Sequence, residues 1–465
     1  MAELHASRAV GVRPFLRADV AAEQAPGVAW LMVIGAVALL AAKPLLDIPG
    51  EKTASDNIDL GMLATVLGAL LMIGSLVVVS AASLRLPLQA VIGPAAILGM
   101  LLLSLVNMVA AADRSDLFAI FALPRPELFG PYVPPARGMM TEAARLLVTF
   151  APVFLLATFL VRRSWVPERY VRWTVTLFTL GAIVHCAIAW LQFAGVVPYT
   201  FFFELPGKSI GRASGAYFHP ASLGILLIFG TFALYASGGG WLHKPLLRYP
   251  LLLTFLATAA ITMHRMTILT LLALILLFGT WHVVGVIRSL RIRPFAVLLA
   301  VPVSLVLAGV VGFVAVRWGR LLWDSAAFLL THVGSLDIES GDFLRGRGMI
   351  WSDLAAVWSR ATADIWLVGV GYEPWNTHND LIRVGVIWGI AGILLVAAIF
   401  SNLWLSTWRR VDANGRWALI CLYVMLGIFG STQKPTAYPY FVWLFLFSHM
   451  MLIALHARER PARSH

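Results

Sequence analysis

The sequence predicts an all-α polytopic membrane protein with about twelve spanning helices. Hydrophobic residues make up 60% of the 465-residue chain, and its mean hydropathy is +0.84. Apolar runs recur along the chain at close to the twenty or so residues that a helix needs to cross the hydrocarbon of a bilayer. Backbone groups that face lipid must form hydrogen bonds within their own segment, so each run is expected to be helical.

The apolar runs fix the expected order of elements. We place the spans at residues 28–46, 60–82, 88–110, 141–161, 171–194, 217–236, 246–264, 266–286, 294–315, 380–404, 417–431 and 438–456. The chain then divides into an N-terminal tail (1–26), the first nine spans (27–315), one long polar loop (316–379), three further spans (380–456) and a C-terminal tail (457–465). The run after residue 26 is long enough to span, which favours a membrane helix over a cleaved signal peptide.

The positive charge of the chain is distributed unevenly between the two predicted faces. The chain holds 35 Lys and Arg against 23 Asp and Glu, a net charge of +12. Most of the basic residues in short loops and tails fall on the face that carries both termini, which predicts that this face is cytoplasmic. This pattern argues against nucleic acid as a partner. The two cysteines, Cys186 and Cys421, lie inside predicted spans and are expected to be buried thiols.

Several arginines fall on the opposite, outer face, where cations are disfavoured: Arg212, Arg265, Arg317, Arg320, Arg345, Arg347 and Arg360. Cations kept on that side need a reason, and binding an anion is the natural one. The Pro-rich outer segment 111–140 cannot form a continuous helix, and no function follows from it.

Arg212 lies in a glycine-containing loop directly before the span that starts near Pro220. Glycines beside the arginine allow the backbone to approach a ligand closely, and a proline suits the first turn of a helix. A clamp for a phosphate or diphosphate is one interpretation, with His219 in support. An arginine that snorkels at a helix end is the other, and both stay open.

Arg265 lies between two spans that need almost all of residues 246–286. With a rise of about 1.5 Å per residue, no room remains for a loop, so Arg265 is expected at or just below the outer interface. Holding a cation at that depth in the membrane costs free energy, so its presence there favours a functional role. The neighbouring His264 is more typical of a structural histidine.

The strongest candidate for acid–base chemistry is His378, which precedes the span from residue 380. An imidazole titrates near neutral pH and can take a proton from an attacking hydroxyl, with Asn379 or Asp380 to orient it. Alternatively, the polar residues here form a helix N-cap, which does not account for the histidine. The loop before it contains amphipathic stretches at 317–331 and 349–360, and Arg345 and Arg347 precede the second of these.

Three elements in this order resemble the superfamily of O-antigen ligases and O-antigen or exopolysaccharide polymerases. They are Arg212-x-x-Gly-x-x-x-His-Pro220, the Arg265 hairpin, and Arg347-Gly-Met-Ile-Trp351 followed by Gly369-Val-Gly371, His378-Asn379 and Gly389-Ile-Ala-Gly392. The resemblance covers roughly residues 205–395. The chain departs from the family pattern at Ala221, where asparagine is common, and at Ile387, where glutamate is common.

This resemblance implies a C-type membrane glycosyltransferase in a bacterial inner membrane, with its active site on the periplasmic face. Such enzymes use neither a metal ion nor a nucleotide sugar, and move a glycan from undecaprenyl diphosphate to an acceptor hydroxyl. Carried over by position, Arg212, Arg265 and Arg347 would bind the diphosphate, and His378 would act on the acceptor. Arg345, His219, Asn379 and Asp380 would support them.

Three functions stay open at this point. A polymerase that extends exopolysaccharide or O-antigen repeat units is favoured by the Trp-rich loop and the His-Asn-Asp-x-x-Arg383 stretch. A ligase of lipopolysaccharide biosynthesis would use the same donor with lipid A–core as the acceptor. A transporter of lipid-linked glycans is the competing non-enzyme. It would need ionisable or polar groups near the bilayer midplane, for which His185, Gln192 and Arg383 are the candidates. A non-catalytic scaffold would leave the outer arginines unexplained.

Overall fold

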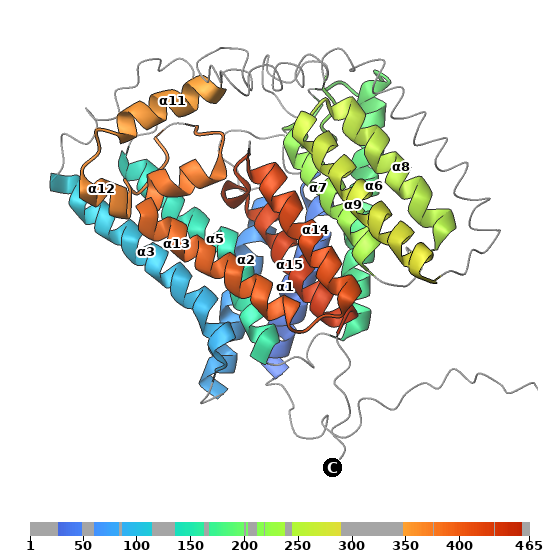
Figure 1. Ribbon diagram of the computed structural model, residues 1–465, viewed down its shortest axis with the longest axis horizontal. Helices are drawn as coiled ribbons and strands as arrows, with labels where there is room; N and C mark the ends of the chain where they lie inside the picture. Colours follow the sequence, from blue (N-terminus) through green and yellow to red (C-terminus); the bar gives the residue numbers. More distant parts are fainter. Residues whose placement is uncertain are drawn as a thin grey trace, which may run out of the picture.

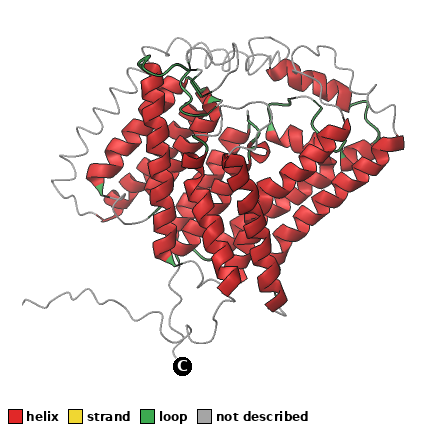
Figure 2. Cartoon of the chain, turned by 180° about the vertical axis from the view of Figure 1, so that it is seen from behind, coloured by secondary structure: helices red, strands yellow, loops and turns green. Residues whose placement is uncertain are grey.

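The protein is described here from a computed structural model. The described residues are 27–48, 60–82, 86–113, 135–161, 167–199, 201–202, 212–217, 219–237, 244–289, 347–374, 376–431 and 433–457. Across these ranges the regular secondary structure is helical, apart from one isolated bridge between Val411 and Ala457 (Figure 2).

Nine of the described helices are long and apolar enough to cross a membrane. They are α1 (Gly27–Leu46), α2 (Leu60–Ala82), α3 (Leu88–Asp113), α5 (Pro135–Val161), α6 (Glu168–Phe193), α8 (Pro245–Thr262), α9 (Arg265–Ser289), α13 (Asp380–Trp408) and α14 (Ala413–Gly430). The prediction of an α-helical membrane protein is confirmed. Every predicted span except 294–315 matches a described helix; 294–315 and the amphipathic stretch 317–331 lie outside the described residues. The total of twelve spans stays a prediction.

The two matching helices that are too short to count among those nine are α7 (Pro220–Ala236) and α15 (Pro439–Leu455). Both are buried along nearly their whole length. A helix that is apolar all round is stable where other helices cover every face, so these two lie in the interior of the bundle. Phe229 of α7 packs edge-on against Phe441 of α15, with ring centroids 5.1 Å apart.

One end of the bundle carries the described turns before α7 and α13 and between α8 and α9; it is drawn uppermost in Figure 1 and is called the upper end below. Helices α3, α6, α8 and α14 end there, and α5, α7, α9, α13 and α15 begin there. The short helices α11 (Arg347–Trp358), α12 (Ala363–Val368) and η5 (Pro435–Ala437) also lie at this end. A separate small apolar cluster, which includes Ile350, Ile365, Met139 and Val386, packs α11 and α12 onto α5 and α13.

Helix α13 is broken near its start. Gly389 has φ 63° and ψ −160°, far outside helical values, and divides the helix into an upper and a lower part. The loop after α12 fills the break: Val370 donates its backbone N–H to Val386 O (2.9 Å), and Gly371 donates to Ile387 O (2.8 Å). The backbone groups released by the break therefore have partners, as a buried helix requires.

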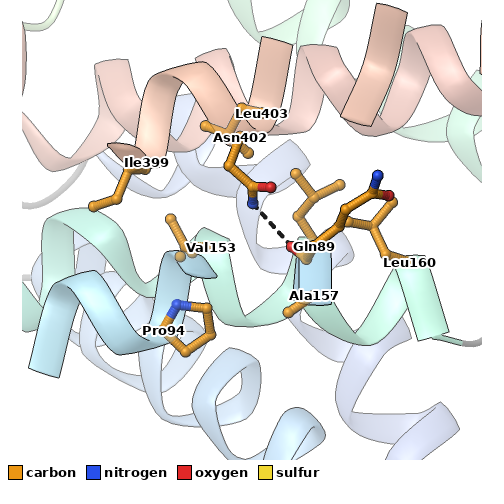
Figure 3. A pocket seen from close by; sticks show the side chains of 10 residues that line it. Gln89, Pro94, Val153, Ala157, Leu160, Ile399, Asn402 and Leu403 are labelled. Atoms are coloured by element: carbon orange, nitrogen blue, oxygen red, sulfur yellow. Dashed lines mark hydrogen bonds between the residues drawn. The ribbon is translucent and has the colours of Figure 1, made fainter. Parts of the chain in front are cut away.

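A small pocket lies between α3, α5 and α13, toward the end of these helices opposite the upper end (Figure 3). Mostly apolar side chains line it, and Asn402 Nδ2 donates to Gln89 O (2.8 Å) at its edge. None of the residues that line it is a site residue predicted from the sequence. The candidate site is therefore found among the polar contacts of the upper end.

Candidate functional site

The loop that carries Arg212 is held against α6 by two side chains. Gln192 Oε1 accepts the N–H groups of Ser214 (3.1 Å) and Gly215 (3.0 Å), and its Nε2 donates to Gly215 O (2.8 Å). His185 accepts the Ala216 N–H at Nδ1 (3.3 Å). Gly215 has φ 65°, where a side chain would be strained. His185 and Gln192, which were midplane candidates for a transporter, thus bind the backbone of this loop.

Arg212 joins the loop to the turn between α8 and α9. Its Nε donates to Thr262 O (3.2 Å) and its Nη2 donates to Met263 O (2.7 Å). These are carbonyls at the C-terminus of α8, where the helix dipole favours a cation. Met263 ends α8 in the left-handed region, with φ 52°, and the exposed Arg265 begins α9 two residues later. Arg212 and Arg265, two of the three arginines predicted to bind the diphosphate, therefore belong to one local structure.

Two histidines border the arginines. His219 is the N-cap of α7, and its Nδ1 accepts the Ala221 N–H (3.1 Å). Desolvation and the positive charge of Arg212 lower the pKa of His219 below its ordinary value, so the imidazole is neutral at neutral pH. His264 lies 6.2 Å away, ring centre to ring centre, and contacts Thr267 through Nδ1 (2.8 Å). It caps the start of α9, which agrees with the structural role expected for it.

The predicted acid–base group lies at the start of α13. His378 is half-buried and has φ 52°, and its N–H donates to Asn376 Oδ1 (3.2 Å). Asn379 is the N-cap of α13: its Oδ1 accepts the Ile382 N–H (3.0 Å). Asp380 Oδ1 accepts the hydroxyl (2.5 Å) and the N–H (3.2 Å) of Thr436. Asn379 is therefore the helix N-cap that the sequence offered as the alternative, whereas Asp380 joins α13 to Thr436.

A single segment contacts both halves of the site. We call Ser431 together with residues 433–436 the connector segment. Ser431 O accepts a hydrogen bond from Asn379 (3.0 Å), and Gln433 contacts His264 Nε2 (3.3 Å). Further along, Lys434 and Thr436 contact residues of the α13 region. The hairpin with Arg265 and the loop with His378 are thus held to the same few residues.

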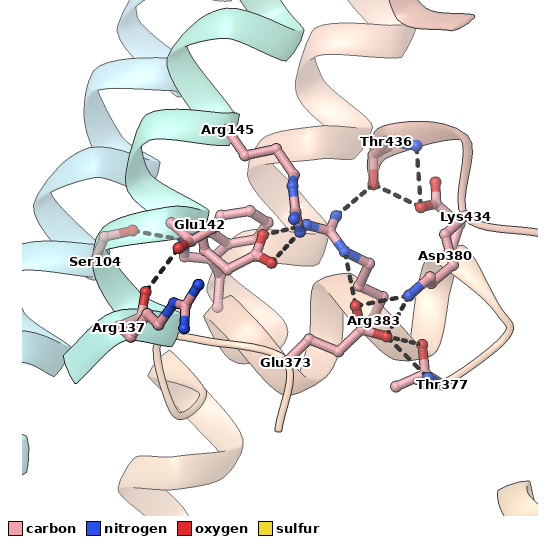
Figure 4. A network of polar contacts seen from close by, with 12 residues as sticks. Ser104, Arg137, Glu142, Arg145, Glu373, Thr377, Asp380, Arg383, Lys434 and Thr436 are labelled. Carbon is pink, nitrogen blue, oxygen red and sulfur yellow. Dashed lines mark hydrogen bonds and ion pairs between the residues drawn. The ribbon is translucent and has the colours of Figure 1, made fainter. Parts of the chain in front are cut away.

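Next to His378, the connector segment takes part in a buried network of charged groups (Figure 4). Arg383, with a side chain that is 1% exposed, pairs with Glu142 of α5 and lies 3.3 Å from Glu373. Lys434 Nζ donates to both oxygens of Glu373 (2.9 Å each). Arg145 also pairs with Glu142.

The charged groups of this network are paired. Three cations (Arg145, Arg383, Lys434) contact two acids (Glu142, Glu373), and Asp380 is joined to them through Thr436, whose hydroxyl also accepts a hydrogen bond from Arg383. Burial by itself raises the pKa of Glu373, but Lys434, Arg383 and the Thr377 N–H outweigh it, so the pKa lies below the ordinary value. Glu373 is therefore an anion at neutral pH.

Glu142, Glu373 and Lys434 of this network are functional candidates that sequence reasoning missed, whereas Asp380 was among the predicted residues. Glu142 could have been found, because a carboxylate at the start of an apolar span is costly and needs a partner. Glu373 and Lys434 lie in short polar loops, far apart in the sequence, and no local signal marks them. Arg345 lies outside the described residues, and Arg347 begins α11 with a side chain that is not described. Among the described residues, no three His, Cys, Asp or Glu side chains gather as metal ligands do.

No protein-family model matches the chain, and comparison with curated proteins gives no match. The function is therefore argued from the residues and geometry of the site.

Proposed function

We propose that the protein transfers a glycan from an undecaprenyl-diphosphate carrier to a sugar hydroxyl, at the upper end of its helical bundle. The observation that carries this proposal is that the connector segment contacts both halves of the site. It holds the arginine hairpin, through His264, and the histidine loop, through Asn379 and Glu373, at one end of a membrane-embedded bundle. An anion-binding group and a proton acceptor on one polar surface suit a lipid-linked anionic donor.

The chemistry follows from the leaving group. The acceptor oxygen forms a bond with the anomeric carbon of the donor, while the bond from that carbon to the phosphate oxygen breaks. The electron pair of the broken bond stays on the diphosphate, whose growing charge Arg212 and Arg265 stabilise. A guanidinium keeps its charge at every relevant pH and can make paired hydrogen bonds to phosphate. The N-termini of α7 and α9, which begin beside these arginines, add to the positive potential. His378 takes the proton of the acceptor hydroxyl.

The proposal also includes an orientation of the protein in the membrane. The upper end faces the periplasm, and both termini lie in the cytoplasm of the inner membrane. The fold is of the C-type glycosyltransferase kind, with twelve spans. Two observations favour an enzyme over a transporter: His185 and Gln192 hold the Arg212 loop, and Arg383 is neutralised by buried acids. A transporter would need such groups to bind its cargo.

We propose a polymerase of repeat units and keep the ligase as the second candidate, because both use the same donor and differ in the acceptor. A strain that lacks the protein distinguishes them when both its carrier-linked glycans and its surface polysaccharide are profiled. Single repeat units in place of long chains indicate a polymerase. Long chains that stay on the carrier, beside bare lipid A–core, indicate a ligase. Unchanged polysaccharide in both fractions contradicts the proposed transfer.

A further inference from the structure

Glu373 occupies a central position in the upper end, although it is not among the proposed site residues. Its side chain is 8% exposed. It accepts hydrogen bonds from the Thr377 N–H (2.8 Å), the Thr377 hydroxyl (2.9 Å) and Lys434 Nζ, and Arg383 Nε lies 3.3 Å away. These groups occupy both carboxylate oxygens. An acid with this many partners fixes the positions of all of them.

The partner that matters most is Thr377, because it precedes His378. His378 has φ 52°, which is strained for a residue other than glycine, and such a conformation persists only where its surroundings fix it. Thr377 is 1% exposed, and three of its groups make four contacts. Its N–H and hydroxyl contact Glu373, its hydroxyl also lies 3.1 Å from Asn379 O, and its carbonyl accepts Trp351 Nε1 (3.1 Å). The backbone on the N-terminal side of His378 is therefore held by Glu373.

The same carboxylate reaches the other half of the site. Both Glu373 oxygens accept Lys434, which directly follows Gln433, the residue in contact with His264 beside Arg265. A path of contacts thus runs from the His378 loop through Glu373, Lys434 and Gln433 to His264 in the arginine hairpin. Because cations stand on two sides of it, this position needs a negative charge: the amide of a glutamine would turn an N–H₂ donor toward Lys434 or Arg383.

We infer that Glu373 is a positioning residue: it holds His378 in its left-handed conformation through Thr377 and sets its place relative to the arginine hairpin through Lys434. Glu373 does not touch substrate in this assignment. The holding of the loop is independent of what the protein does, whereas the effect on glycan transfer rests on the proposed function.

The test compares Glu373→Gln with Glu168→Gln in the full-length protein purified in detergent. Glu168 is the matched control because it pairs with Arg172 at the opposite end of the bundle and its side chain is 57% exposed. The first readout is hydrogen–deuterium exchange of the peptide that contains Thr377. We expect the Thr377 amide to exchange at least about tenfold faster in Glu373→Gln and at the wild-type rate in Glu168→Gln.

The second readout is steady-state transfer with a lipid-diphosphate-linked glycan as the donor. We expect kcat to fall by about tenfold to a hundredfold in Glu373→Gln, while KM for the donor stays within about twofold, because misplacing His378 slows chemistry without removing the arginines. Thr377→Val, which keeps the charged network and removes only the hydroxyl, serves if Glu373→Gln does not fold; it should give a smaller fall in kcat of the same kind.

The outcomes separate the two proposals. Unchanged exchange at Thr377 overturns the positioning role, whatever the transfer rate. Faster exchange with unchanged kcat overturns the coupling of Glu373 to catalysis. If the wild-type protein transfers no glycan, the proposed function fails, and exchange alone then decides whether Glu373 holds the loop.

Discussion

Gly369 and Gly389 face each other backbone to backbone across the break in α13. A Cβ atom on Gly369 would lie 2.4 Å from Ile387 O, and a Cβ atom on Gly389 would lie 2.4 Å from Leu367 O. Both residues have positive φ, 73° and 63°. Two glycine motifs that are separate in the sequence therefore form one junction, at which the loop that leads to His378 is joined to the helix that follows it.

The junction predicts a large cost for a single methyl group. We expect Gly389→Ala to lower the free energy of unfolding by more than about 2 kcal/mol, because the left-handed backbone and the clash with Leu367 O add together. Gly427→Ala is the control, since a Cβ at Gly427 meets nothing within 4 Å. Thermal unfolding in detergent should show a lower Tm for the first variant alone. Equal Tm values would contradict the close approach.

The buried network predicts that removing its central cation is costly. Arg383→Met leaves Glu142 and Glu373 short of a partner in the interior, so we expect a loss of about 3–5 kcal/mol of stability. Adding Glu142→Gln should recover part of that loss, because it removes one of the uncompensated charges. Arg172→Met breaks a partly exposed pair and should cost no more than about 1 kcal/mol. A double-mutant cycle on Tm measures the coupling between Glu142 and Arg383. Additive effects of the two substitutions would contradict this prediction.

The proposed diphosphate site predicts that shape matters as well as charge. We expect Arg265→Lys to abolish most transfer and leave membrane insertion intact, because one ammonium cannot reproduce the planar fork of a guanidinium. Arg409→Lys, at the lower end of α13, is the control and should transfer glycan at the wild-type rate. Initial rates with a lipid-diphosphate-linked donor decide the matter. A fully active Arg265→Lys variant would remove this residue from the site.

The lowered pKa of Glu373 predicts how stability depends on pH. The unfolded chain binds a proton near the ordinary pKa of 4.5, and the folded chain binds it only at lower pH. Glu373 therefore contributes stability that is fully present above about pH 4.5 and is lost as the pH falls through the lowered pKa. Tm measured between about pH 3 and pH 7 should fall less steeply on the acid side in Glu373→Gln than in the wild type. Parallel curves would show that Glu373 is not held as an anion.

Hydropathy was enough to locate the helices, because a membrane imposes one length and one composition on every span. It also placed Arg265 at the start of a helix, His378 just before one and Arg212 in the loop that precedes α7, where the structure has them. Periodicity could not predict how deeply each helix is buried in the bundle. The sequences of α7 and α15 resemble those of the other spans, yet these two helices are enclosed on nearly all sides.

The partners of the site residues could not be predicted for a related reason. Glu142, Glu373 and Lys434 come from three parts of the chain, and their meeting depends on how the helices pack. The break at Gly389 could not be predicted for the same reason. A glycine within an apolar span is compatible with an unbroken helix, and the break is explained only by the close approach of Gly369 across the junction. The sequence identified charged residues near helix ends but did not predict their contacts.

The connector segment also imposes an order on biosynthesis. All its partners in the site, from His264 to Arg383, precede it in the chain and leave the ribosome first. The arginine hairpin and the histidine loop can be held together only after α14 has been inserted and the residues that follow it have been made. A nascent chain halted before that point lacks the contacts that hold the two halves of the site together.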